Sequence, residues 1–502
     1  MFKRLSLLTL ISFSFLTTSS LASTVSKLAD TTAEYAVATY TKPMVDSLAE
    51  LVKYNTVAKE GVASTDNPVH IAFKNELKKQ ATELGLDFTD HGYIVVIGLG
   101  ESKERVGIIT HGDVQPATPS KWAKSPFELD TTTEPGKLIA RGTEDDKGAI
   151  STAMFAMKSI KDNKIPLKKR LELYVYMAEE SDWEPLQTFV KNNILPQINI
   201  TIDASYPVVT AEKGFGTLKI AFAKEETTSF SPYLKHFEGG YFGSQIPEDA
   251  KAVIQNADVY LLDQLMNKAK TYHEGINFNF ELKDSALTVT ALGKSAHSSE
   301  PEGGVNAIPY LADLLSDTRW INNGAGTLVN FINDNIGLGL EGKKFGKIAY
   351  SDDFMGPMTV SPTVIKQHDS NIELNINIRR PKGKTAQQLR NEITDTIAKW
   401  KLNNLANITE LDHYIGDPFI QNEAPQTPIL LNVFSKYTGI KNPKPVSIGG
   451  GTNSRLFPNA VSFGPSMPDA IYTGHSEHEF ITMKQFILNL KMYTAVMVEL
   501  AR

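Results

Sequence analysis

Residues 171–180 read LELYVYMAEE, an apolar, strand-like run that ends in two adjacent carboxylates, Glu179 and Glu180. Open α/β sheets bind their ligands at the carboxyl ends of the strands, although a single Glu-Glu pair is more often an ordinary acidic loop. Here the pattern recurs, as His111-Gly112-Asp113 after residues 108–109, Asp203 after residues 200–202, Asp145 and Asp146 in the turn GTEDDKG (142–148), and His475 in a late loop. Such clusters beside strands and glycine-rich turns indicate a site for two metal ions.

The composition limits the class of protein. A chain of 502 residues is too long for one ordinary domain and suits two or three. A content of 41% hydrophobic and 22% charged residues is that of a soluble globular protein. The formal net charge of −6 argues against a nucleic-acid partner, which would require a basic face. Because the sequence contains no cysteine, any metal ion must be held by histidine and carboxylate side chains.

The first residues have the features of a secretory signal peptide. Lys3 and Arg4 form a positive segment, residues 5–16 form an apolar segment too short to span a bilayer comfortably, and Ser20-Leu21-Ala22 is a cleavage motif. We expect cleavage after Ala22, with an uncleaved membrane anchor as the alternative. An exported chain without disulfides fits a bacterial periplasm. We therefore predict a periplasmic or secreted protein without membrane contact after cleavage.

From about residue 25 to residue 212, helix-like and strand-like segments alternate. The predicted helices are 43–53, with Pro43 in the first turn, 70–84 and 148–162. The predicted strands are 93–97, 106–110, 171–178 and 199–202. This alternation is typical of an α/β fold with a mostly parallel sheet covered by helices on both faces.

The pattern changes after Gly214. Strands with period-2 alternation are predicted at 217–223, 278–282, 285–292 and 371–378, with helices at 305–315 and 386–400. The α/β pattern returns near Pro418, with helices at 429–437 and 482–500. We therefore predict a signal peptide (1–22), a first part of the main domain (23–214), an inserted α+β lid domain (215–418) and a second part of the main domain (419–502).

The clustered side chains suit a hydrolytic site for two metal ions. Two ions roughly 3.5–4 Å apart need one bridging carboxylate and about two further ligands each. The set His111, Asp145, Glu180, Asp203 and His475 provides them. Asp113 lies two residues beyond His111, on the same face of a strand, where its carboxylate can orient a ligand or a bound water. Glu179 would remain free to act as the general base.

In several segments the chain resembles a known family, the dinuclear-zinc exopeptidases related to aminoacylase, carboxypeptidase G and succinyl-diaminopimelate desuccinylase. The branch it resembles most is that of the PepV-type (Xaa-His, carnosinase-like) dipeptidases. The segments that carry the resemblance are HGDVQPA (111–117), KWAKSPFEL (121–129), ARGTEDDKGA (140–149), AEESDW (178–183), DASYPV (203–208), AEKG (211–214), GKSAHSSEPEGGVNA (293–307), NIRRP (377–381), SIGGGTNSR (447–455) and MPDAIYTGHSEHEF (467–480). They run through the mature chain in the order that the family has.

The resemblance implies a role for each position. His111 and Asp203 would hold one ion, Glu180 and His475 the other, and Asp145 would bridge them. Glu179 would be the base acting on a water between the two ions, and Asp113 its supporting acid. His297 would polarise the scissile carbonyl. The substrate carboxylate would meet Arg379 and the backbone of the run Gly450-Gly451-Thr452. Ser244 stands where relatives have asparagine, which leaves the preferred side chains of the substrate open.

Some assignments compete. Arg380 neighbours Arg379, and His478 is an alternative ligand to His475; the motif register favours Arg379 and His475. Asp146 is expected to cap the helix that follows the GTEDDKG turn.

The predicted function is a dipeptidase that uses two divalent metal ions, with Zn²⁺ first and Mn²⁺ or Co²⁺ as alternatives. Its partner would be a small dipeptide, and its state a monomer in which the lid delivers His297 within one chain. The alternatives are a hydrolase of N-acyl amino acids or a carboxypeptidase with the same chemistry, and an inactive peptide-binding protein.

Overall fold

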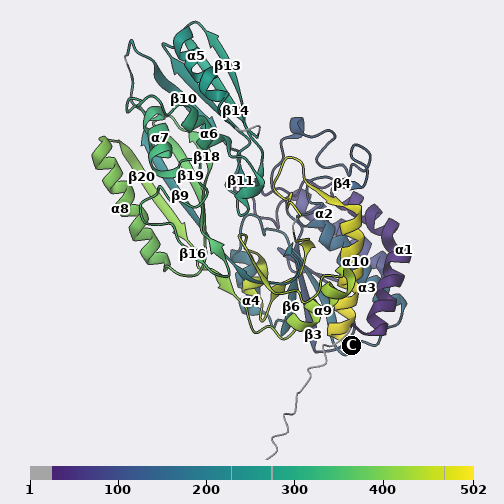
Figure 1. Ribbon diagram of the computed structural model, residues 1–502. Helices are drawn as coiled ribbons and strands as arrows, with labels where there is room; N and C mark the ends of the chain where they lie inside the picture. Colours follow the sequence, from purple (N-terminus) through teal and green to yellow (C-terminus); the bar gives the residue numbers. More distant parts are fainter. Residues whose placement is uncertain (1–24, 228, 273–274, 469) are drawn as a thin grey trace, which may run out of the picture.

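The computed structural model of the protein describes residues 25–227, 229–272, 275–468 and 470–502. The predicted signal peptide lies outside the described residues. Figure 1 shows two lobes, a first lobe built from the beginning and the end of the chain and a second lobe built from its middle. Within the described residues, none of the helices has the length and apolar character needed to cross a membrane.

The first lobe contains a mixed sheet with a parallel centre. The strand order is β1-β2-β5-β3-β6-β23-β8-β21, with β22 beside β8. Strands β5, β3, β6 and β23 are parallel to one another, whereas β1, β2 and β21 pair antiparallel. The bounds are β1 Asp87–Asp90, β2 Ile94–Leu99, β3 Arg105–His111, β5 Arg170–Tyr176, β6 Ile198–Thr201, β8 Val209–Glu212, β21 Phe419–Ile420, β22 Val446–Ile448 and β23 Val461–Ser462. The predicted α/β fold with a mostly parallel sheet is confirmed.

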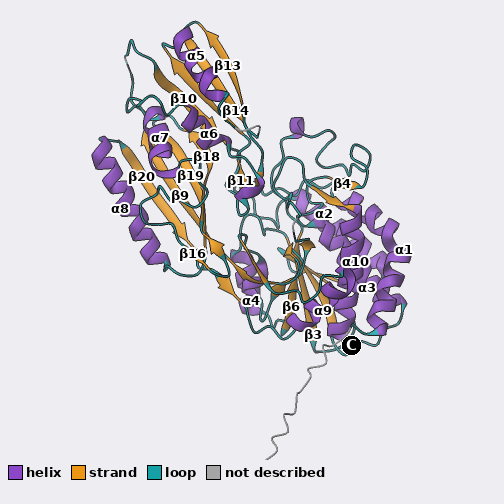
Figure 2. Cartoon of the chain, viewed as in Figure 1, coloured by secondary structure: helices purple, strands orange, loops and turns teal. Residues whose placement is uncertain are grey.

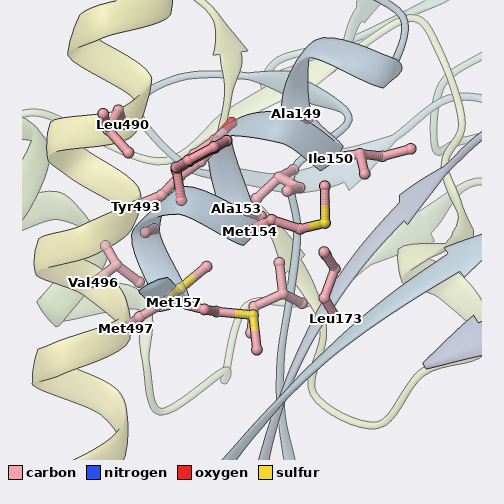
Figure 3. Packing of buried hydrophobic residues seen from close by; sticks show 14 of the residues in the cluster. Ala149, Ile150, Ala153, Met154, Met157, Leu173, Leu490, Tyr493, Val496 and Met497 are labelled. Atoms are coloured by element: carbon pink, nitrogen blue, oxygen red, sulfur yellow. The ribbon is translucent and has the colours of Figure 1, made fainter. Parts of the chain in front are cut away.

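Helices cover both faces of this sheet. The helices on one face are α1 (Lys27–Leu51), α2 (Pro68–Leu84), α3 (Lys147–Asp162), α9 (Thr427–Thr438) and α10 (Met483–Ala501), and α4 (Glu184–Asn192) lies on the other. Figure 3 shows α3 between α10 and the sheet, with Met157 near Met497 of α10 and Met154 near Leu173 of β5. Full burial of such a side chain contributes roughly 1.5–3 kcal/mol. This core therefore fixes α3, and with it the turn from which α3 starts.

Helix α1 differs from the prediction. It begins at Lys27, so Pro43 lies inside it and not in its first turn. Ser26 caps its start by accepting a hydrogen bond from the Ala29 amide. An internal proline costs about 3 kcal/mol, but the Pro43 ring is exposed and the opposite face, which includes Met44 and Leu48, is fully buried. Packing of that face outweighs the cost of the proline.

The second lobe is an antiparallel sheet in the order β13-β14-β12-β10-β18-β19-β9-β20. Its helices are α5 (Val259–Ala269), α6 (Ala307–Leu314), α7 (Ala325–Phe331) and α8 (Ala386–Asn404), drawn with the sheet in Figure 2. Buried residues of these helices and of the sheet form one core. The strands are β9 Gly214–Ala223, β10 Tyr233–Gly239, β12 Asp249–Gln255, β13 Asn277–Lys283, β14 Ala286–Leu292, β18 Thr359–Gln367, β19 Asn371–Arg380 and β20 Ile408–Ile415. The alternation of buried and exposed positions predicted for these strands is present, for example in β14.

The chain crosses between the lobes at two adjacent points. A Cβ added to Gly214 would lie 2.4 Å from the carbonyl oxygen of Gly416, so only glycine allows the two crossings to touch. Arg380 donates to the same Gly416 carbonyl (2.7 Å) and forms an ion pair with Asp417. A short ladder of β11 (Gln245–Ile246) and β15 (Ala296–His297) then places His297 over the first lobe.

Candidate metal centre and substrate cavity

The predicted metal ligands converge at the carboxyl ends of the central strands. His111 ends β3, Glu179 and Glu180 follow β5, and Asp203 follows β6. Because β5, β3 and β6 are neighbours in the sheet, their ends bring these side chains together. Asp145, in the turn before α3, and His475, in the loop before β25 (Phe480–Thr482), complete the cluster.

The five side chains form two groups that share Asp145. Ligand atoms of His111, Asp145 and Asp203 lie within 4.8 Å of one another, and so do those of Asp145, Glu180 and His475. His111 Nε2 lies 2.9 Å from Asp145 Oδ1 and 3.7 Å from Asp203 Oδ2. His475 Nε2 lies 3.1 Å from Asp145 Oδ2 and 2.6 Å from Glu180 Oε1. One carboxylate therefore presents a separate oxygen to each group.

The donors and their surroundings fit two divalent cations. His111 Nδ1 faces the Asp113 carbonyl oxygen at 3.0 Å, which leaves Nε2 for a metal. Burial raises the pKa of Asp203 to about 6. It also raises the pKa of Glu179 well above its usual range, and the nearby Asp203 and Glu180 add to this effect. Bound cations would neutralise the negative charge of these closely spaced carboxylates.

Asp113 organises the pair that follows β5. Its Oδ1 accepts a hydrogen bond from the Glu179 amide and its Oδ2 one from the Glu180 amide, each at 3.0 Å. Asp113 is fully buried, and its Oδ1 lies 3.5 Å from His111 Nδ1. It thus aligns the backbone of Glu179 and Glu180 and touches the ring of His111. The Glu179 carboxylate has a longer contact, 3.4 Å from Asn453 Nδ2.

A buried carboxylate whose role the sequence did not reveal holds the turn that carries Asp145. Oε1 of Glu479 accepts hydrogen bonds from the amides of Gly142 (2.9 Å), Glu144 (3.0 Å) and Asp145 (3.1 Å). Its Oε2 pairs with Arg141 Nη1 at 2.8 Å, and neither side chain is more than 1% exposed. In the sequence, Glu479 appears only as part of the segment MPDAIYTGHSEHEF (467–480).

Asp146 does not cap α3 with its side chain, contrary to the prediction. Its Oδ2 instead accepts a hydrogen bond from the Thr110 hydroxyl, on the strand that ends in His111. The expectation failed because the turn directs this carboxylate towards the sheet and not along the helix. The peptide bond between Asp145 and Asp146 is cis.

His297 enters the site from the second lobe of the same chain. Its ring centroid lies 4.2 Å from that of His475. The Ser299 amide donates to His297 Nδ1 at 3.0 Å, so the neutral ring carries its proton on Nε2. Burial lowers the pKa of His297 well below its usual range, and His475 and Arg379 lower it further. The ring is therefore a neutral hydrogen-bond donor.

The strand β11, which pairs with the strand of His297, and the residue before it also touch the last loop. The carbonyl oxygen of Ser244 accepts from the Ser298 amide (2.8 Å) and lies 3.4 Å from His475 Nδ1. Gln245 Nε2 donates to the carbonyl oxygen of His475 at 2.8 Å. The two lobes are thus joined at the residue that completes one of the metal groups.

The candidates for binding the substrate carboxylate also line the cavity. Arg379 is buried and packs over the Phe215 ring at 4.9 Å. Its Nε donates to Asn377 (3.0 Å) and its Nη2 lies 3.5 Å from the hydroxyl of Ser298. Within the described residues Arg379 has no carboxylate partner, so its guanidinium can bind a substrate carboxylate.

The glycine run lines the same cavity as Arg379. A Cβ added to Gly449 would lie 2.1 Å from the carbonyl oxygen of Ser299, which explains why this backbone needs glycine. Gly450, Gly451 and Thr452 line the cavity. The Thr452 hydroxyl donates to Glu212 at 2.6 Å, so it is occupied by a structural contact.

The competing residues lie elsewhere. Arg380 binds the backbone at the crossing between the lobes. The His478 side chain is 53% exposed and contacts Glu134 at 2.5 Å. The structure therefore brings Arg379 and His475 into the site and leaves Arg380 and His478 outside it.

The cavity between the lobes has a volume of about 620 Å³, which is in the range of small-molecule sites. The residues named above that line it are Asp145, Glu179, Glu180, Asp203, Ser244, His297, Arg379, Gly450, Gly451, Thr452 and His475. Other lining residues, which the sequence did not single out, include Trp183, Phe215, Glu300, Tyr414 and Tyr472. They come from separate segments of both lobes; Trp183, Glu300 and Tyr472 lie within motifs quoted above, but nothing in those motifs singled them out as cavity residues.

Comparison with known proteins finds relatives that are described as dipeptidases. The chain is 30% identical over 416 residues to a Beta-Ala-Xaa dipeptidase of Lactobacillus delbrueckii subsp. lactis, covering 81% of this chain and 84% of that protein. It is 29% identical over 473 residues to a putative dipeptidase of Staphylococcus aureus, covering 90% and 96%. Human carnosine dipeptidase 1 shares the fold, with a TM-score of 0.58 and 15% identity over 94% of this chain and 99% of that one.

The yeast di-peptidase Dug1p from Saccharomyces cerevisiae also shares the fold, with a TM-score of 0.58 and 13% identity over 93% of this chain and 98% of that one. A family model, described as peptidase family M20/M25/M40, matches residues 107–499. That match spans well over half of the chain and includes every predicted metal ligand. The chain therefore belongs to peptidase family M20/M25/M40.

Proposed function

We propose that this protein is a metal-dependent dipeptidase with Glu179 as its general base. The observation that carries the proposal is the pair of ligand groups sharing Asp145 beside the half-buried carboxylate of Glu179, which belongs to neither group. The dipeptidase names of the relatives support the same activity. Two divalent cations, zinc first and manganese or cobalt as alternatives, would be held by His111, Asp145, Asp203, Glu180 and His475 and would supply Lewis-acid polarisation and a more acidic water.

In this proposal, Glu179 transfers the proton of the attacking water. Burial raises the pKa of Glu179, and a carboxylate with a raised pKa is a better base than one in solvent. It takes a proton from the attacking water at a carboxylate oxygen and returns it to the leaving nitrogen. Asp113 keeps the backbone of Glu179 in place through the 3.0 Å hydrogen bond to its amide, so Asp113 acts as a positioning residue.

His297 and Arg379 orient the substrate. The proton on His297 Nε2 can be donated to the carbonyl oxygen of the scissile bond, where negative charge develops. Arg379 offers a planar guanidinium to a terminal carboxylate. A fixed carboxylate anchor at one side of a small cavity favours a short peptide cleaved next to its C-terminal residue.

A substrate panel tests the proposal. The zinc-loaded protein is given a dipeptide, its N-acetyl form, its C-terminal amide and an N-acyl amino acid, with Glu179→Gln as the matched control for contaminating activity. We expect hydrolysis of the free dipeptide, with weak activity on the amide because Arg379 loses its partner. Faster turnover of N-acetyl or N-acyl substrates would instead identify an acyl amino acid hydrolase or a carboxypeptidase. No turnover of any compound by a zinc-loaded protein would support a peptide-binding role.

We also propose that the mature protein is periplasmic or secreted and acts as a monomer. The charged, apolar and small-residue segments that end at Ala22 support export. Support for the monomer comes from the cavity, where His297 and Glu179 of one chain line the same space. N-terminal sequencing of the purified protein tests cleavage; a start other than Ser23 would contradict the predicted position.

A further inference from the structure

Tyr472 touches the shared ligand. Its hydroxyl lies 2.6 Å from Asp145 Oδ2, and its ring lines the substrate cavity. An ionised carboxylate only accepts hydrogen bonds, so the tyrosine donates. Its ring centroid lies 5.7 Å from that of His297, in an edge-to-face arrangement. The side chain therefore stands between the shared carboxylate and the histidine of the second lobe.

The local backbone leaves room for this ring. A Cβ added to Gly474 would lie 2.3 Å from the Tyr472 hydroxyl and 2.4 Å from the ring carbon that carries it. Any other residue at position 474 would force the hydroxyl away from Asp145. The placement of Tyr472 is thus built into the chain by the glycine two residues later.

Tyr472 contacts only one of the two carboxylate oxygens of Asp145. Asp145 Oδ2 is the oxygen that faces His475, at 3.1 Å from its Nε2. Asp145 Oδ1 faces His111, and within the described residues this oxygen has no second side-chain partner. Each carboxylate oxygen can accept in two directions. Oδ2 can therefore accept the hydrogen bond from Tyr472 and still bind a cation together with Glu180 and His475.

We propose that Tyr472 is a positioning residue that fixes Asp145 Oδ2 towards the cation held with Glu180 and His475, while Oδ1 faces the one held with His111 and Asp203. This inference rests on the proposed function, since it requires that cations bind there. Partners of this kind typically change metal affinity by roughly 10–100-fold. The effect should fall on one ion of the two.

The test compares wild type with Tyr472→Phe, which keeps the ring and its contact with His297 and removes only the hydroxyl. Zinc bound per chain is measured at graded concentrations of a competing chelator. Tyr260→Phe, in a side chain that is 81% exposed on α5, is the matched control. Thermal melting checks that the variants fold. We expect two ions in wild type and in the control, and one ion held about 10–100-fold more weakly in Tyr472→Phe.

The same substitution in a His475→Ala background identifies the affected ion. There we expect Tyr472→Phe to leave the affinity of the remaining ion unchanged. Equal weakening of both ions, or unchanged affinity for both, would overturn the role of Tyr472 while leaving the proposed function intact. A wild-type protein that binds no zinc, manganese or cobalt would overturn the proposed function, and this inference with it.

Discussion

Replacing Glu479 by glutamine tests how the turn that carries Asp145 is held. Glutamine keeps an oxygen for the amides of Gly142, Glu144 and Asp145 but removes the charge that faces Arg141 at 2.8 Å. Arg141 is 1% exposed, and its remaining hydrogen bond goes to the Pro116 carbonyl at 2.9 Å. Removing one partner of a buried ion pair costs about 3–5 kcal/mol, because the other charge stays buried without compensation.

That cost should appear as a lower melting temperature, on the order of 10 °C for a domain of this size. Differential scanning calorimetry of metal-loaded and metal-stripped protein measures it. In the matched double variant, Glu479→Gln with Arg141→Met, no guanidinium remains unpaired, so the loss should be smaller than the sum of the two single losses by roughly 0.5–3 kcal/mol. A melting temperature within about 2 °C of wild type, or additive losses in the double variant, would refute the reasoning.

Further predictions address the site itself. Glu179→Gln should retain both metal ions, measured by elemental analysis, and lose activity by at least roughly a thousandfold, because an amide cannot take the proton; near-normal activity would mean that another group is the base. His475→Ala should lower metal content severely and His478→Ala only slightly, since His478 is exposed at the surface; the reverse order would move the ligand by three residues. Mixed Glu179→Gln and His297→Ala proteins should stay inactive if the protein is a monomer, whereas recovered activity would show that His297 acts across subunits. Glu300 lines the cavity without a side-chain partner in the described part of the chain, so Glu300→Gln should raise KM for dipeptides with cationic side chains and not for neutral ones; equal effects on both would exclude charge recognition.

Much of the fold could be predicted because its signals are local. The period-2 run at 371–378 became β19, and the apolar run at 171–178 became the central strand β5. The helix predicted at 148–162 matches α3 within one residue at its start. The start of α1 could not be predicted, because the packing that stabilises a helix through Pro43 comes from α3 and α10, far along the chain.

In the candidate site, too, residues with a local signal in the sequence could be predicted, and residues that act through distant contacts could not. His111, Asp145, Glu180, Asp203 and His475 could be selected because each follows a strand or lies in a distinctive turn, and the structure brings them together. The residues that position them gave no such signal. The role of Glu479 depends on three backbone amides more than three hundred residues earlier in the chain, and that of Tyr472 on a contact that forms only when the last loop folds over the turn.

The contact between Gln245 and the carbonyl of His475 couples the relative position of the two lobes to the position of His475. Any separation of the lobes must break this hydrogen bond and move Ser244 away from the ring of His475. A cation that held His475 in its present place would therefore favour the arrangement in which the lobes are joined. By thermodynamic linkage, a peptide that favoured the same arrangement would strengthen the binding of that cation, and the cation would strengthen the binding of the peptide by the same factor. The affinities for metal and for substrate would then be coupled, and each would be defined only at a stated concentration of the other.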